Sequence, residues 1–210
     1  MTIKLIVADP HEVTRKGLAS LLADEDVTIV AQAVTGAEAI SKTRRHKPDV
    51  LLMEVRLPGV DGLDALEKIR DSLPKTQVII MSTEASPTYL ARAVALGAAA
   101  FLHKNEPAEV FVAAIKAAAR GEPAPADSAM GKMKAELDQR LDPETDDVPL
   151  TKREYQVLRH LAHGLSNREI AKSLKISIET VKEYVQNLLW KMKMKGRTEA
   201  AVWALKRGLI

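Results

Sequence analysis

The sequence predicts an α/β unit with a doubly wound, five-stranded parallel sheet, followed by a smaller all-α unit of four helices. Three observations support this prediction. Short apolar runs alternate with amphipathic stretches over the first 120 residues, and every pattern from Leu150 onward is helical. The segment between the two units is rich in proline, alanine and acidic residues, which is typical of a linker.

The first unit alternates strand and helix patterns. The expected strands lie at residues 3–8, 27–33, 49–54, 77–82 and 99–103. The expected helices lie at residues 11–24, 36–46, 61–72, 86–96 and 106–120. Near-continuous apolar runs separated by helices predict parallel strands covered on both faces. Ligands of such sheets bind outside the carboxyl ends of the strands.

The rest of the chain is predicted to be helical. Residues 122–148 form an acidic linker with one short helix near residues 128–141. Four further helices are expected near residues 151–163, 167–174, 178–193 and 197–207. Thr151 and Ser166 each precede a glutamate by three residues, which is the pattern of a capping box. The domain boundaries are therefore placed at residues 1–121, 122–148 and 149–210.

Charge is distributed unevenly along the 210 residues, whose net charge is +3. Residues 1–120 hold 15 Lys and Arg against 15 Asp and Glu, and residues 121–149 hold 3 against 8. Residues 150–210 hold 13 against 5, which is a net charge of +8. We therefore expect only the last unit to meet a polyanion such as a nucleic acid.

The composition excludes several classes of protein. The chain has no cysteine, which excludes disulfides, thiolate nucleophiles and Cys-based metal sites. The N-terminus enters a strand pattern directly, and no apolar run approaches the roughly 18 residues of a membrane span. These features predict a cytoplasmic protein that does not contact a membrane.

Polar side chains gather where the predicted strands end. The first strand is followed by Asp9, the third ends at Glu54, the fourth ends at Ser82 and the fifth is followed by Lys104. Because parallel strands end at one edge of the sheet, these side chains are expected to converge there. Acids, a hydroxyl and a lysine together are typical of a site that handles phosphate.

Residues 1–121 resemble the receiver domain of two-component response regulators, which has a flavodoxin-like fold. The motifs VADPH, PDVLLMEVRLPGVDG, VIIMS and GAAAFLHKNEP carry the resemblance. The family has two acids after its first strand and a phosphorylated aspartate after its third. A Ser or Thr ends the fourth strand, and an aromatic residue precedes a lysine after the fifth. In this sequence those positions are, in order, Asp9 and Pro10, then Glu54, Ser82, Phe101 and Lys104.

Two of these positions depart from the family pattern. Pro10 offers no side-chain oxygen for Mg²⁺, and Glu54 is one methylene longer than aspartate. A phosphoacceptor displaced by roughly 1 Å is expected to lose about 100-fold in rate. We therefore expect weak or absent Mg²⁺ binding, no cofactor, and activity without phosphorylation. Glu54 is expected to project a permanent carboxylate toward Lys104 and Ser82.

Several alternatives remain open at this site. Asp9 can cap the following helix, with Glu12 completing a capping box, instead of helping to bind a metal. The receiver can be phosphorylated conventionally, serve only as a dimerisation scaffold, or respond to an unidentified ligand or adaptor protein. An enzyme ranks last, because the sequence has no glycine-rich phosphate loop and no second metal-binding acid.

Residues 149–210 resemble the LuxR-type helix-turn-helix domain, and the whole chain resembles a NarL/FixJ-family regulator. The motifs LTKRE, GLSNREIAKSL, ISIETVKEYVQNLL and RTEAAVWA carry this second resemblance. It implies a transcription regulator that binds double-stranded DNA as a homodimer, on half-sites about one helical turn apart. The dimer surface is expected near residues 198–206, on the receiver, or on both. An interaction module that binds RNA or a protein is the alternative.

The resemblance also assigns residues. The base-reading face falls on Lys182, Glu183 and Gln186. Phosphate contacts are expected from Thr180, Asn167, Arg168 and Lys172. Tyr184 stands where the family commonly has histidine, and a packing or phosphate contact is expected of it. Trp190 and Trp203 are expected in the core.

Overall fold

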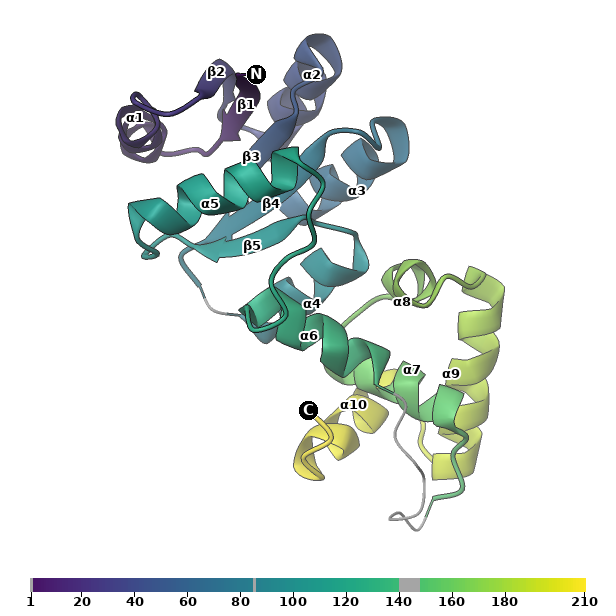
Figure 1. Cartoon of the computed structure of the whole chain (residues 1–210). Coiled ribbons are helices and arrows are strands. Elements are labelled where there is room, and N and C mark those ends of the chain that lie inside the picture. The colour runs from purple at the N-terminus through teal and green to yellow at the C-terminus, as the bar shows by residue number, and fades with distance from the viewer. Residues whose placement is uncertain (1, 85, 140–147) are drawn as a thin grey trace.

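A computed structural model describes residues 2–84, 86–139 and 148–210. It confirms the predicted fold class: a five-stranded parallel sheet flanked by helices, followed by a helical domain (Figure 1). The strand order is β2-β1-β3-β4-β5. Strand β2 is added on one side of β1 and the later strands on the other, so the strand order switches between β1 and β3. That switch point is where a doubly wound sheet binds its ligands.

The elements of the first domain begin and end within a few residues of their predicted positions. The strands are β1 (Ile3–Ala8), β2 (Val27–Ala33), β3 (Val50–Glu54), β4 (Gln77–Ser82) and β5 (Ala100–His103). The helices are α1 (Glu12–Leu21), α2 (Gly36–His46), α3 (Gly62–Ser72), α4 (Pro87–Ala95) and α5 (Ala108–Ala119). Parallel pairing joins each neighbouring pair of strands, as the near-continuous apolar runs predicted.

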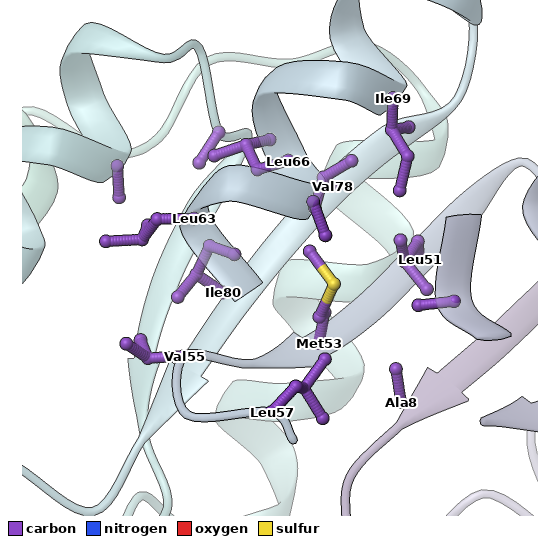
Figure 2. Close-up of a cluster of buried hydrophobic side chains, with 14 of the residues drawn as sticks. Ala8, Leu51, Met53, Val55, Leu57, Leu63, Leu66, Ile69, Val78 and Ile80 are labelled. Atoms are coloured by element: carbon purple, nitrogen blue, oxygen red, sulfur yellow. The ribbon is translucent and has the colours of Figure 1, made fainter. Parts of the chain in front are cut away.

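Side chains of successive strand residues point to opposite faces, which divides the core into two layers. On one face, Leu51 and Met53 of β3 pack with Leu63 and Leu66 of α3 (Figure 2). On the other face, Leu52 packs in a cluster that includes residues of α1 and α5. Helices α2, α3 and α4 therefore cover one face, and α1 and α5 cover the other.

The remaining helices are α6 (Ala129–Asp138), α7 (Lys152–Ala162), α8 (Asn167–Leu174), α9 (Ile178–Met192) and α10 (Arg197–Lys206). Both predicted capping boxes are present, at Thr151 with Glu154 and at Ser166 with Glu169. Ser177 caps α9 by accepting a hydrogen bond from the Thr180 N–H, at 3.0 Å. Part of the predicted linker, residues 140–147, lies outside the described residues.

Helix α6 packs against both domains, in addition to linking them along the chain. Met130 packs into the core layer between the sheet and α2, α3 and α4, while Met133 and Leu137 pack into the core of the helical domain. Ala91 and Ala95 of α4 belong to that second core as well. The two domains therefore share packed side chains through α4 and α6. Within the described residues, no helix has the length and apolarity to cross a membrane.

Candidate functional site

The sheet brings four predicted polar residues to one edge. Asp9 follows β1, Glu54 ends β3, Ser82 ends β4 and Lys104 follows β5. Because β1, β3, β4 and β5 are consecutive in the sheet, their carboxyl ends form one row. A backbone hydrogen bond from the Lys104 N–H to the Ser82 carbonyl, at 2.8 Å, ties the β5 exit to β4.

Lys104 lies between two buried carboxylates. Its Nζ is 2.5 Å from Asp9 Oδ2 and 2.5 Å from Glu54 Oε2. The side chains of Asp9 and Glu54 are 0% and 6% exposed, and that of Lys104 is 13% exposed. One ammonium group thus compensates two acids that water barely reaches, which makes this cluster costly to break.

The backbone positions the Glu54 carboxylate. Its Oε1 accepts a hydrogen bond from the Arg56 N–H at 3.0 Å, so both oxygens are bonded. Gly62, at the start of α3, donates its N–H to the Val55 carbonyl at 2.7 Å. A Cβ at Gly62 would lie 2.1 Å from the Glu54 carbonyl oxygen, so only glycine allows this approach. The LPGVDG segment therefore packs α3 directly against the residue that carries the acid.

The environment of Lys104 favours its charged form. Burial would lower the pKa of Lys104, but its hydrogen bonds to Asp9 and Glu54, and their negative charge, outweigh burial and raise it. At neutral pH the ammonium is therefore protonated and holds both acids together. The cluster resembles a fixed ion triad more than an open phosphate site.

Ser82 and Phe101 are near this cluster but not part of it. The Ser82 hydroxyl accepts a hydrogen bond from the Glu84 N–H at 3.0 Å. No contact between that hydroxyl and Glu54 or Lys104 is found among the described residues. The Glu54 carboxylate therefore contacts Lys104, as expected, but not Ser82. Phe101 is half-buried and packs against the core under α3 and α4.

The helix-capping alternative for Asp9 is wrong. The N-cap of α1 is His11, whose side chain makes no capping hydrogen bond. Asp9 Oδ1 instead accepts the His11 N–H at 2.8 Å, and Oδ2 faces Lys104. Asp9 lies two residues before the N-cap, and its carboxylate bonds to the His11 N–H and to Lys104 instead of to an N–H inside α1.

Weak or absent Mg²⁺ binding at this edge stays a prediction, and the chemistry of the residues present is consistent with it. Both available carboxylates already contact the Lys104 ammonium, and Pro10 contributes no side-chain oxygen. Mg²⁺ requires near-octahedral oxygen ligands, which two acids engaged by a lysine do not supply. Among the described residues, no group of three or more His, Asp or Glu side chains is arranged to hold a metal.

The second predicted site lies on α8 and α9. These helices are joined by a short turn in which Lys175 adopts a left-handed conformation. Lys182, Glu183 and Gln186 are exposed on α9, while Val181 and Leu188 are buried beneath them. The structure thus leaves the expected base-reading face accessible.

Thr180, Asn167 and Tyr184, which were also expected to contact DNA, all contact other residues of the helical domain. The Thr180 hydroxyl lies 2.9 Å from that of Ser177, and Asn167 Oδ1 accepts a hydrogen bond from Arg197 at 3.3 Å. Tyr184 is half-buried against the domain core, which favours a packing role.

Arg168 and Lys172 face the first domain. Glu67 Oε1 of α3 lies 2.8 Å from Arg168 Nε and 3.1 Å from Lys172 Nζ, although neither contact has hydrogen-bond geometry. Lys172 Nζ also donates to Asp71 Oδ1 at 2.9 Å. Two side chains that were expected to contact phosphate are therefore held by receiver carboxylates.

Sequence reasoning missed this junction. Arg92 of α4 donates to Glu169 of α8 at 2.5 Å. Burial would raise the pKa of Glu169, but the hydrogen bond from Arg92 and the capping contacts with Ser166 lower it. The spacing of Glu67 and Asp71, four residues apart on α3, signals only a polar helix face. A distant cationic partner cannot be read from that spacing.

The two tryptophans differ. Trp203 is half-buried against the helical core and stacks under Arg207, whose guanidinium carbon lies 4.7 Å from the ring centre. Trp190 is 81% exposed, so the expectation that it lies in the core is wrong. It lies on the polar side of α9, opposite the buried residues.

Comparison with known proteins supports both halves of the chain. The family model "Response regulator receiver domain" matches residues 5–116, and "Bacterial regulatory proteins, luxR family" matches residues 148–204. The response regulator protein VraR of Staphylococcus aureus is 33% identical over 211 residues, covering all of both chains.

Solved structures agree over the full length. The response regulator ChrA of a heme-sensing two-component system is 28% identical, with a TM-score of 0.54 over 100% of this chain and 99% of ChrA. RcsB, in a complex with DNA, has the same fold, with 22% identity and a TM-score of 0.59 over 98% of each chain. This chain therefore belongs to the response-regulator family, with a receiver domain followed by a regulatory domain of the luxR family.

Proposed function

We propose that this protein is a sequence-specific transcription regulator that binds double-stranded DNA through α9. The observation that carries the proposal is the exposed row of Lys182, Glu183 and Gln186 on a helix whose opposite side is buried. Donors and acceptors placed in this way fit the edges of bases in the major groove. The domain's net charge of +8 supports attraction to a polyanion.

We further propose that it acts as a homodimer in the cytoplasm. Helix-turn-helix dimers bind paired half-sites about one helical turn apart, and RcsB illustrates the same fold in a complex with DNA. Competition between duplex DNA and duplex RNA for the purified protein tests the alternative of an RNA-binding module. Preference for RNA would reject the DNA proposal.

We propose that the receiver works without phosphorylation. The support is the Lys104 cluster, in which the phosphoacceptor position is a glutamate already bonded to a buried lysine. Phosphoryl transfer to Glu54 would require breaking this ion pair, and transfer without an oriented Mg²⁺ loses most of its electrostatic stabilisation. The carboxylate supplies one negative charge at that position, fewer than a phosphoryl group would supply.

Incubation with acetyl phosphate and Mg²⁺, followed by intact-mass measurement, tests this proposal. We expect no adduct of about 80 Da, the mass of a phosphoryl group. The Glu54→Asp variant restores the usual acceptor and serves as a comparison for the geometry, while Pro10 still removes one metal ligand. Stoichiometric addition of about 80 Da to the unmodified protein would reject phosphorylation independence.

Release of α8 from the receiver is expected to strengthen DNA binding. The Glu67→Gln/Asp71→Asn variant removes the carboxylates that hold Arg168 and Lys172. Partly exposed ion pairs contribute only about 0.2–1 kcal/mol each, so we expect a gain of roughly threefold to tenfold in affinity. Fluorescence anisotropy with labelled duplex, at several salt concentrations, measures it.

A matched control for this prediction lies on another part of the receiver. Glu12→Gln removes the exposed carboxylate that pairs with Lys16 on α1, far from α8 in the sequence. It should leave DNA affinity unchanged. If both variants bind equally, the receiver carboxylates do not restrain α8.

A further inference from the structure

In the first turn of α9 Ile178 is 36% exposed, but no large apolar side chain of this helix, all of which is described, is as exposed as Trp190. Trp190 is 81% exposed, whereas Val181, Leu188 and Met192 of the same helix are buried. An exposed tryptophan is unusual, because its burial is among the most favourable that a side chain can offer. Packing in the core of the helical domain therefore does not explain why a tryptophan stands at this exposed position.

Helix geometry places Trp190 on the expected base-reading face. It follows Gln186 by four residues and Glu183 by seven, spacings that align side chains along one side of a helix. Each residue advances a helix by about 1.5 Å, so Trp190 lies about 6 Å beyond Gln186 along the axis. Figure 1 shows α9 on the side of its domain away from the sheet, with α8 nearer to it.

We propose that Trp190 is a DNA-contacting residue that packs against the wall of the major groove beyond the bases read by Lys182 and Gln186. This inference rests on the proposed function. The apolar ring would lie on deoxyribose or thymine methyl groups, and the indole N–H would donate to a phosphate oxygen. The side chain would thus extend the contact surface of α9 by about one helical turn.

The surrounding charge favours DNA over a second copy of this protein as the partner of Trp190. The exposed charges of α9 are mixed, since Glu179 and Glu183 are exposed as well as Lys182, but the domain as a whole has a net charge of +8. Two copies of a domain with this net charge repel each other, which disfavours a symmetric contact through this face. A phosphate backbone would instead neutralise the charge.

A single-tryptophan protein allows a direct test. In Trp203→Phe, Trp190 is the only tryptophan, so its emission reports its own surroundings. The probe is a duplex recovered by the unmodified protein from genomic fragments, and a scrambled duplex of the same length is the comparison. We expect the emission of Trp190 to shift and fall in intensity as the duplex saturates the protein.

Affinity provides the second readout. Trp190→Ala should weaken binding to the recovered duplex about tenfold, because an indole face loses its contact area. Its thermal unfolding should be unchanged, since the side chain is 81% exposed in the free protein. Val13→Ala, which removes an 84% exposed apolar side chain from α1, is the matched control and should bind like the unmodified protein.

Three outcomes would overturn the inference, and they differ in what they say about the function. Gel-shifted complexes with unchanged Trp190 emission and unchanged affinity of Trp190→Ala would reject the tryptophan contact and leave DNA binding intact. Emission that depends on protein concentration without DNA would assign Trp190 to contacts between copies. Absence of any DNA complex would reject both the contact and the proposed function.

Discussion

Replacing Lys182 by alanine is expected to lower affinity for the genomic operator about tenfold to a hundredfold and to relax the sequence preference at one base pair. Lys182 is exposed two turns before Trp190 on the face of α9 that is free of core contacts. Its single described ion pair, with Glu179 at 3.7 Å, is long and exposed, so little is lost when it breaks. A good base contact contributes about 1–3 kcal/mol of discrimination.

Capture of genomic fragments by the purified protein, followed by sequencing, measures this effect. The unmodified protein should enrich one palindrome-like motif without any phosphodonor, and Lys182→Ala should not. Lys132→Ala removes an exposed cation from α6, outside the helix-turn-helix, and should enrich the same motif. Enrichment that survives in Lys182→Ala would contradict the assignment of this residue to base reading.

Salt dependence separates base reading from phosphate contact. In the Glu67→Gln/Asp71→Asn background, where the receiver no longer holds Lys172, Lys172→Ala should weaken binding to all sequences alike and reduce the slope of log K against log salt concentration by about one. Lys182→Ala should instead change the preferred sequence. Enrichment that appears only after addition of a phosphodonor would contradict the proposal that the receiver works unphosphorylated.

The second large effect is expected on stability. Lys104→Met should lower the free energy of unfolding of the receiver by about 2–4 kcal/mol, because it leaves Asp9 and Glu54 buried beside each other without the ammonium group that they share. The methionine approximates the length of the lost side chain, so packing changes little. Urea unfolding followed by far-ultraviolet circular dichroism measures the loss.

Two controls make this prediction specific. Lys16→Met removes one partner of an exposed pair on α1 and should change stability by less than about 0.5 kcal/mol. Combining Asp9→Asn and Glu54→Gln with Lys104→Met removes all three charges and should recover most of the loss. If Lys104→Met alone is as stable as the unmodified protein, the cluster is not the buried ion triad described above.

The same cluster determines a dependence on pH. Because the folded state raises the pKa of Lys104, the stability that Lys104 contributes is fully present below the ordinary lysine value. That contribution is lost as pH rises through the raised folded value. Unfolding of the unmodified protein should therefore become easier in strongly alkaline buffer, while Lys104→Met should show a smaller change over the same range.

Much of this fold is predictable because its signals are local. The apolar runs over β3 and β4 are continuous, and helical periodicity between them requires parallel pairing. The capping boxes at Thr151 and Ser166 specify where α7 and α8 begin. Parallel strands also end on the same side, so the gathering of Asp9, Glu54 and Lys104 follows from the strand boundaries alone.

Other features depend on which surfaces meet. The sequence carries no sign that one lysine serves both acids, nor that Ser82 bonds to Glu84 instead of joining them. Trp190 carried a usable signal, since four residues separate it from Gln186 on a polar face, but its residue type favoured the core. Spacing was the better guide here, because the face of a helix decides which side chains can reach the core.

By itself, the sequence determined the two-domain architecture, the strand-end residues and the exposed face of α9, because each follows from periodicity within a short segment. Only the tertiary structure decided that Arg168 and Lys172 face Glu67 and Asp71, and that α4 and α6 pack into both cores. Ion pairs between residues about 100 positions apart depend on how whole domains dock, and side-chain periodicity carries no information on that.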